Sequence, residues 1–162
     1  MRVIIHDLGK QYDGLLKNKC DCLIRADGRY APCQGCFNCW TKHPARCFMG
    51  DSLQEVCRIV GRADELIIIS ENCYGSYGPN VKNIIDRSIG ISKPLSTYRG
   101  RQMHHKLRYG MHKLIHVIAY GAITEDEKET FSLLAERNAL NFGFENLQFT
   151  YIDNIDSLES CI

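Results

Sequence analysis

The chain has no apolar run near the ~20 residues that a helix needs to cross a bilayer. It also has little net charge, because 20 Lys and Arg residues face 19 Asp and Glu residues, with only a mild basic excess between Arg99 and Lys113. Nucleic acid and membrane surfaces are therefore poor candidate partners. Internal repeats and low-complexity segments are absent. Residues 1–162 are expected to form one domain, because this length buries a full hydrophobic core.

Several catalytic signatures are also missing. The sequence has no P-loop, no Gly-x-Gly-x-x-Gly fingerprint, no Ser/His/Asp arrangement and no paired-carboxylate motif. No motif of these kinds points to phosphoryl transfer, to a Rossmann dinucleotide site or to acyl transfer.

Cysteine, in contrast, is abundant, with nine residues. The number is odd, and the first apolar residues are interrupted at once by His6 and Asp7, which does not resemble a signal peptide. We therefore expect a reducing, cytoplasmic location in which the thiols are unpaired or act as ligands.

Four of the cysteines fall in one short stretch, Cys33, Cys36, Cys39 and Cys47. Two overlapping Cys-x-x-Cys steps followed by a fourth thiol suit a loop that wraps a cluster or a metal ion. Three interpretations are open: a [4Fe-4S] cluster, a structural zinc ion, and reduced thiols that hold no metal. The stretch predicts redox or metal chemistry.

Apolar runs predict a parallel sheet. Continuous runs of this kind are typical of strands that are buried on both faces. Five strands are expected, at residues 3–5, 20–24, 66–69, 114–119 and 147–152. Helical periodicity, with capping boxes at Ser52-x-x-Glu55 and Thr124-x-x-Glu127, predicts helices at 52–60, 81–89 and 125–141. This alternation predicts a doubly wound α/β domain with the flavodoxin-like strand order 2-1-3-4-5.

Two helices of that fold are expected to be abbreviated. Neither residues 7–19 nor residues 153–162 can hold a normal three-turn helix. Both segments would cover the same sheet face, and exposed apolar area costs roughly 25 cal/mol per Å². We therefore expect a homo-oligomer, or a complex with another subunit, that covers this face. The alternative is that short irregular segments cover it.

The loop that follows the strand at residues 66–69 is the main candidate for a ligand site. Open α/β sheets bind ligands at the carboxyl ends of their strands. Gly75 and Gly78 allow a ligand to approach the backbone, and exposed amides there can hold the polar edge of a flat ring. An ordinary glycine-rich turn is the alternative.

Several motifs in chain order carry a resemblance to a known family. They are Pro32-Cys33-x-Gly35-Cys36-x-x-Cys39-Trp40, Cys47 with Asp51, Ala63-Asp64, the Tyr-Gly loop, Lys82-x-x-x-Asp86-Arg87 and Met103-His104-His105-x-x-Arg108-Tyr109. Together they resemble the NADPH-dependent FMN reductase branch of the flavodoxin-like superfamily. The cysteine spacing is also similar to that of the iron-sulfur flavoproteins within it. The resemblance covers about residues 30–122.

The resemblance implies a bound FMN, oligomerisation, and electron flow from NAD(P)H or another donor through the flavin to a small-molecule or protein acceptor. The flavin performs the chemistry, so no catalytic side chain is assigned. The resemblance places the flavin ring against the loop residues Glu71, Asn72, Cys73, Tyr74, Gly75 and Ser76, and against Tyr120 and Gly121. The cysteine stretch is expected near the same end of the sheet, and the loop with His104, His105, Arg108 and Tyr109 over the flavin mouth or in a subunit interface.

The segment expected to hold the FMN phosphate departs from the family pattern. Relatives place hydroxyl residues after the first strand, whereas this chain has Gly9 and Lys10 between the carboxylates of Asp7 and Asp13. In the ring loop, Glu71-x-Cys73 replaces the usual Pro-x-Tyr. Two alternatives therefore stay open: an iron-sulfur flavoprotein that carries electrons, and a flavin-free flavodoxin-like module that pairs with another subunit.

Overall fold

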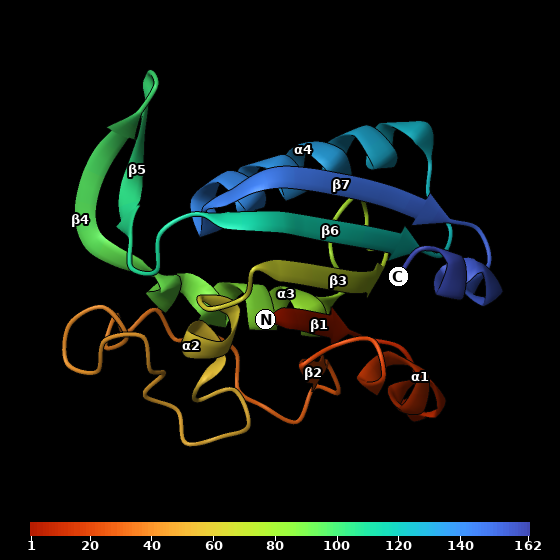
Figure 1. The fold of residues 1–162 in the computed structure, drawn as a ribbon, viewed down its shortest axis with the longest axis horizontal. Helices are drawn as coiled ribbons and strands as arrows, with labels where there is room; N and C mark the ends of the chain where they lie inside the picture. The colour runs from red at the N-terminus through yellow and green to blue at the C-terminus, as the bar shows by residue number, and fades with distance from the viewer.

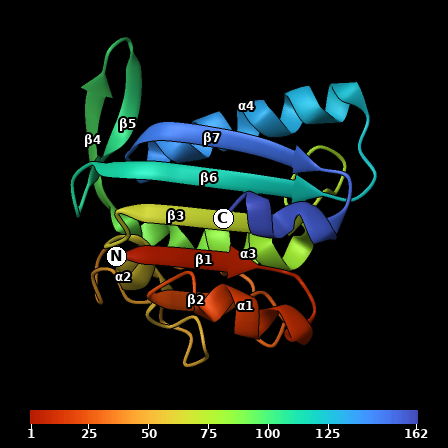
Figure 2. The ribbon, with the colours of Figure 1, turned by 45° about the vertical axis from the view of Figure 1, so that its right-hand side comes forward.

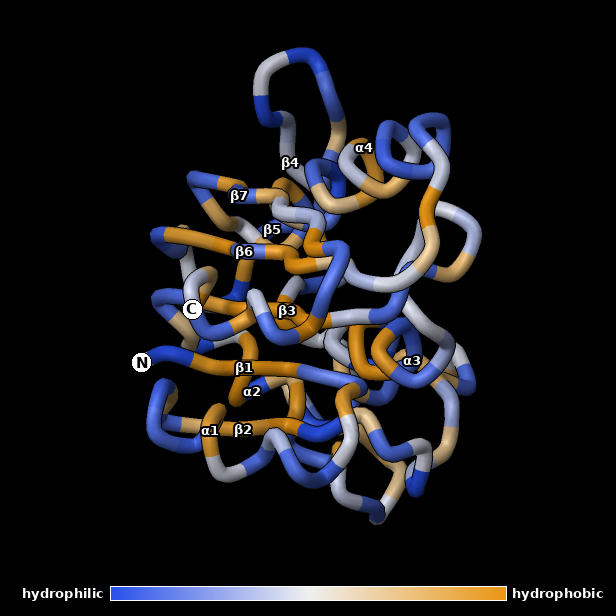
Figure 3. The backbone as a smooth tube through the Cα atoms, turned by 90° about the vertical axis from the view of Figure 1, so that its right-hand side faces the viewer, coloured by the Kyte–Doolittle hydropathy of each residue, from blue (hydrophilic) through white to orange (hydrophobic).

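A computed structural model describes residues 1–162 and contains a five-stranded parallel sheet of order β2-β1-β3-β6-β7 (Figure 1). The strands are β1 (Arg2–His6), β2 (Cys22–Arg25), β3 (Glu65–Glu71), β6 (His112–Tyr120) and β7 (Phe144–Ile152). Numbered within the sheet, this is the predicted order 2-1-3-4-5, and all five expected strands are confirmed. Figure 3 shows hydrophobic stretches along β1, β2, β3 and β6.

The helices differ widely in length. They are α1 (Asp13–Lys17), α2 (Val56–Val60), α3 (Pro79–Arg87) and α4 (Glu125–Phe142), with 3₁₀ turns η1 (Lys10–Tyr12), η2 (Ser88–Ile91) and η3 (Ile155–Ser160). No helix combines the length and the apolar character that a membrane span requires. The predicted helices at 81–89 and 125–141 are confirmed, and the first and last helices are abbreviated as expected.

The predicted helix at 52–60 is shorter than expected. It begins only at Val56, and its N-cap Glu55 makes no side-chain capping bond. The capping box at Ser52 is therefore wrong. Instead, the Asp51 carboxylate accepts a hydrogen bond from the Leu53 amide at 3.0 Å, which holds the preceding residues in a turn. The Thr124 box is confirmed, because its hydroxyl accepts from the Glu127 amide at 3.2 Å and the Glu127 carboxylate accepts from the Thr124 amide at 2.9 Å.

One face of the sheet carries the larger core. Helices α2, α3 and α4 pack there against alternate strand residues such as Val3, Ile68 and Val117. The faces alternate along each strand because successive side chains point to opposite sides.

The other face is covered by the two abbreviated segments. Its strand residues Ile4, Ile67, Ile69 and Ile118 are at most 1% exposed, and they pack with a cluster that includes Leu16 from α1 and Leu158 from η3. The expectation that this face is bare is wrong, because two short segments that each bury one leucine are sufficient cover. Oligomerisation stays a prediction, but an uncovered apolar face no longer supports it.

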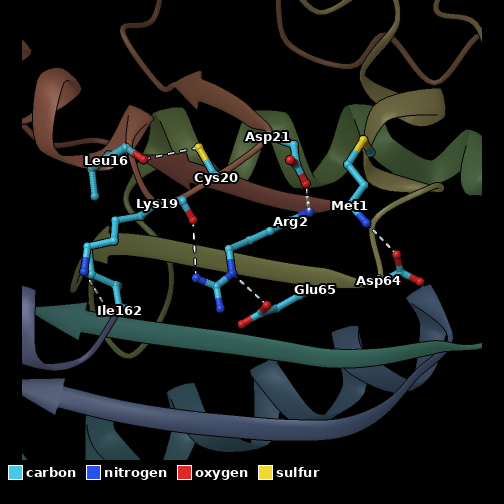
Figure 4. Close-up of polar contacts among 9 residues, drawn as sticks. All are labelled: Met1, Arg2, Leu16, Lys19, Cys20, Asp21, Asp64, Glu65 and Ile162. Atoms are coloured by element: carbon cyan, nitrogen blue, oxygen red, sulfur yellow. Dashed lines mark hydrogen bonds and ion pairs between the residues drawn. The ribbon is translucent and has the colours of Figure 1, made fainter.

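At the amino end, the same face finishes in polar residues (Figure 4). The Arg2 guanidinium bonds the Glu65 carboxylate at 2.7 Å and the Lys19 carbonyl at 3.3 Å. The N-terminal amine pairs with Asp64. Paired charged side chains therefore cover the amino end of this sheet face, beyond the apolar cluster.

An antiparallel hairpin that was not predicted, β4 (Ser92–Arg99) with β5 (Gln102–Leu107), projects from the amino end of the sheet (Figure 2). Its exposed apolar side chains are Leu95, Tyr98 and Met103. At its base the ring of His105 packs on Trp40, with 4.6 Å between ring centroids. The hairpin therefore contacts the long loop that carries the cysteine stretch.

The capping box of α4 provides a stability test. Replacing Thr124 by Ala should lower the free energy of unfolding by about 1 kcal/mol, because one helix amide loses its acceptor. For a chain of this size that corresponds to roughly 2–4 °C in Tm. Urea denaturation measures the change. Glu136→Ala, at an exposed position of the same helix, is the control and should stay within about 0.5 kcal/mol. Equal losses in both variants would contradict the role of the cap.

Candidate functional site

The loops that follow β1, β3 and β6 meet at the carboxyl end of the sheet. Asp7, directly after β1, is their common acceptor. Its carboxylate accepts from the Glu71 amide at 3.0 Å, from the Ser70 hydroxyl at 3.1 Å and from the Tyr120 hydroxyl at 2.9 Å. Burial raises the pKa of Asp7, and these hydrogen bonds offset part of the rise. One half-buried carboxylate thus fixes the relative position of three loops.

The predicted ring loop, residues 71–76, is folded on itself. The Cys73 and Ser76 amides and carbonyls bond each other at 2.9 and 3.1 Å, and the Gly75 amide donates to the Asn72 side chain at 3.0 Å. At the tip, Tyr74 and Gly75 have φ of 52° and 73°, as in a two-residue hairpin turn with positive φ at both positions. The Tyr74 side chain is 90% exposed there.

This loop is also tied to the loop after β6. The Asn72 amide donates to the Tyr120 carbonyl at 2.7 Å, and the Asn72 side chain donates to the Ala122 carbonyl at 2.8 Å. A Cβ placed on Gly121 would lie 3.4 Å from the Glu71 side chain. The exposed Glu71 carboxylate therefore lies between the two loops, where the resemblance places the flavin ring. Sequence reasoning brought Glu71, Asn72 and Tyr120 together correctly.

The segment after β1 contains a row of free donors. The backbone N–H groups of Leu8, Gly9, Lys10 and Gln11 form no hydrogen bond with the protein. Leu8 and Gly9 precede the η1 turn and Lys10 and Gln11 begin it, next to the point between β1 and β3 where the strand order reverses. In flavodoxin-like sheets this point is the ligand crevice.

Asp13, expected to repel a phosphate here, is directed elsewhere. Its carboxylate lies 3.4 Å from the His6 ring nitrogen Nε2 and 3.7 Å from the Arg25 guanidinium. The Arg25 charge therefore compensates Asp13. Lys10 stays exposed beside the free amides. The electrostatic objection from the sequence is weaker in the folded chain.

His6 is a residue that sequence reasoning did not assign. Its side chain is fully buried, and neither ring nitrogen has a hydrogen-bond partner. Burial lowers the pKa of His6, with the nearby Asp13 charge opposing the shift, so the neutral ring is favoured. The signal that could have found it is a polar residue at the end of an otherwise apolar strand.

The residues at the carboxyl end are compatible with FMN. Four adjacent amides and one lysine are available for a phosphate, which binds well to such donors. The ring loop offers fewer free amides, because most are paired within the loop. The Glu71 side chain lies where the flavin ring would bind. It is exposed and forms no hydrogen bond or ion pair of its own, so it can turn to solvent.

The four cysteines of the stretch do come together. Cys33, Cys36, Cys39 and Cys47 line one pocket of about 130 Å³, with Phe37, Phe48, Arg87 and Ile89 among its other walls. All nine cysteines are free, and no three Cys, His, Asp or Glu side chains are grouped closely enough to hold a metal ion. The four cysteines therefore share one pocket, and whether they hold an iron-sulfur cluster, a zinc ion or no metal stays a prediction.

The position of this pocket corrects an expectation. Its walls include Arg87, the last residue of α3, and α3 runs back from the carboxyl end of β3. The pocket therefore lies at the amino end of the sheet, as the orange loop in Figure 1 shows. β3 has seven residues, so at ~3.3 Å per residue the two regions are about 20 Å apart. The thiols are not beside the predicted flavin site of the same chain.

The hairpin belongs to the same amino end. Arg108 donates to the Gly90 carbonyl at 3.2 Å, and a Cβ on Gly61 would clash with the ring of Tyr109. The residues from His104 to Tyr109 therefore do not cover the carboxyl-end loops of their own chain. A place in a subunit interface stays a prediction.

Two residues that line the cysteine pocket, Arg87 and Cys39, have unusual polar contacts. The fully buried Arg87 side chain bonds Asp51 and the Ala31 carbonyl, and its Nε and Nη2 atoms have no hydrogen-bond partner. Proximity to Cys57 lowers the pKa of Cys39, whereas proximity to Cys39 together with burial raises the pKa of Cys57.

Comparison with known proteins finds likeness in structure only. No protein-family model and no curated protein matches the chain. The NAD(P)H:quinone oxidoreductase from Methanothermobacter marburgensis matches with a TM-score of 0.56 at 15% identity, over 99% of this chain and 92% of that one. A putative quinone reductase from Klebsiella pneumoniae has a TM-score of 0.60 at 15% identity, over 96% and 76%. An FMN-dependent NADH-azoreductase from Bacillus anthracis, solved with FMN, has 0.56 at 14%, over 98% and 92%.

The chain has the flavodoxin-like fold. The strand order and the matches over nearly the whole chain agree on this point. At these low identities the likeness concerns the fold, so the chemistry has to be argued from the residues themselves.

The Asp7 carboxylate leads to a test that depends on pH. Because burial raises the pKa of Asp7, the folded chain binds this proton more tightly than the unfolded chain. Its contribution to stability is therefore full at low pH and is lost as the pH rises through the raised value. Asp7→Asn cannot titrate, so its stability relative to the wild type should increase from about pH 3 to about pH 7. Denaturation curves at each pH measure this difference. Asp126→Asn, at an exposed position, is the control. A difference that falls with pH would contradict the assignment.

Proposed function

We propose that this chain is an FMN-dependent oxidoreductase that takes electrons from NAD(P)H and passes them to an acceptor such as a quinone or an azo compound. The observation that carries the proposal is the row of four free amides, Leu8 to Gln11, at the reversal point of a flavodoxin-like sheet. Structural neighbours that are a quinone oxidoreductase and an FMN-dependent azoreductase support the same class.

The residues have separate tasks in this proposal. The Gly9 amide and its neighbours, with Lys10, bind the phosphate, since unpaired backbone N–H groups favour an anion. The loop from Glu71 to Ser76 supports one edge of the ring, and Tyr120 with Gly121 borders the other. FMN, when bound, supplies hydride acceptance and electron release. Asp7 is a positioning residue, because it holds the loops through hydrogen bonds and does not itself contact the flavin in this proposal.

Two alternatives from the sequence are less favoured. An iron-sulfur electron carrier needs ligands for a cluster, and the four thiols of the pocket are not grouped as a ligand set. A flavin-free module that pairs with another subunit gives no role to the free amides. A homo-oligomer in the cytoplasm is part of the proposal, and neither property bears on the choice between these functions.

The backbone of Gly9 provides a sharp test of phosphate binding. Its φ of −56° and ψ of 155° are values that proline also adopts. Gly9→Pro therefore removes one free N–H while the chain path is kept. We expect FMN affinity to fall about 10- to 100-fold, since a hydrogen bond to a charged group contributes roughly 1.5–3 kcal/mol. Titration of FMN followed by flavin fluorescence measures the affinity.

Two comparisons make this result specific. Gly9→Ala adds the same Cβ beside the flexible Gln11 side chain but keeps the N–H, so it should bind FMN like the wild type. Riboflavin, which has no phosphate, should bind both variants equally. An equal loss of FMN affinity in Gly9→Ala and Gly9→Pro would refute the phosphate role.

The activity itself is tested in two steps. A visible spectrum of freshly purified protein should show the two resolved flavin bands, or should show them after FMN is added. NADPH oxidation against a quinone then separates an enzyme from an electron carrier. A colourless protein that takes up no FMN would overturn the proposed function.

A further inference from the structure

One pair of thiols crosses from the cysteine stretch to a helix. Cys39 belongs to the stretch, whereas Cys57 lies within α2, 18 positions further along the chain (57 minus 39). Both are in the main hydrophobic core, with 9% and 0% of their surface exposed. Both also border the same glycine, Gly90. Cys57 falls outside the four-cysteine spacing, so the pair was not predicted from the sequence.

Gly90 marks how closely the two residues approach. A Cβ on this glycine would lie 2.8 Å from the Cys57 sulfur and 3.0 Å from the Cys39 Cβ. Both cysteines therefore pack against the same backbone position, which only a residue without a side chain can occupy. The Cys57 thiol also donates to the Arg87 carbonyl at 3.0 Å, so it is held in place.

We propose that Cys39 and Cys57 are a redox-modification site, at which a peroxide converts the two contacting thiols into a reversible disulfide. This inference does not depend on FMN binding or on a metal in the pocket. It assigns different tasks to the two thiols, because only one of them reaches the pocket.

Access determines the order of the two steps. Cys39 lines the thiol pocket, and Cys57 has no exposed surface. A small neutral oxidant that enters the pocket meets Cys39 first. The Cys39 sulfur attacks one peroxide oxygen and the O–O bond breaks, which gives a sulfenic acid and one water. The Cys57 sulfur then attacks the Cys39 sulfur, the S–O bond breaks and a second water leaves. In total, two thiols and one hydrogen peroxide give one disulfide and two waters.

The disulfide would change the pocket. Cys39 is one of its four thiols, and a bond to Cys57 removes it from any set of ligands there. It would also join the cysteine stretch to α2. A reductant such as a small dithiol reverses the bond by exchange, because the structure keeps the two sulfur atoms adjacent.

The site is tested on the full-length reduced protein with one equivalent of hydrogen peroxide. Two of the nine thiols should be lost. After alkylation of the remaining thiols, trypsin gives residues 30–42 with Cys33, Cys36 and Cys39, and residues 47–58 with Cys47 and Cys57. Mass spectrometry should find these two peptides cross-linked, and dithiothreitol should separate them.

Variants identify which sulfurs are joined. Cys57→Ala and Cys39→Ser should each abolish the cross-link, whereas Cys47→Ser, which removes the other cysteine of the second peptide, should retain it. Cys39→Ser gives the same information if Cys57→Ala, at a fully buried position, fails to fold by circular dichroism. A cross-link that persists in Cys57→Ala or disappears in Cys47→Ser would overturn the proposal, as would oxidation of Cys39 to sulfinic acid without any cross-link.

Discussion

The fold depends on burying a parallel sheet on both faces with very little chain available for one of them. Strand residues of the second face, such as Ile4, Ile67 and Ile118, are almost completely removed from water. Each fully buried side chain of this kind contributes about 1.5–3 kcal/mol. Neither α1 nor η3 is a full helix, yet each places one leucine over the centre of the face. The polar pairs at the amino end then replace the cover that a longer helix would give.

The two ends of the sheet are chemically different. At the carboxyl end, short loops leave backbone amides unpaired, and the Glu71 amide with the hydroxyls of Ser70 and Tyr120 surrounds the Asp7 carboxylate. At the amino end, the long loop and the end of α3 with η2 enclose thiols and a buried guanidinium. The sheet lies between them, so chemistry at one end is insulated from the other end of the same chain.

Most of the fold follows from local pattern. Apolar runs located three of the five strands and two weaker candidates supplied the others, and the capping box at Thr124 located the start of α4, because these signals depend only on neighbouring residues. The turn before α2 and the hairpin were missed for a common reason. Asp51 competes with Ser52 for the amides of the turn, and the hairpin is stabilised by distant contacts such as Trp40 with His105. Neither effect produces a repeating pattern of residues that could be recognised in the sequence.

The candidate site shows the same limit in a more instructive form. Counting carboxylates along the chain made the segment after β1 look hostile to a phosphate, because Asp7 and Asp13 flank Lys10. In the folded chain, one carboxylate is used by three loops and the other faces Arg25. What is left at the surface is a row of amides, which have no signature in a sequence. Tertiary contacts that engage the two carboxylates therefore decide whether this segment can bind an anion. Side-chain composition alone predicts that it repels one.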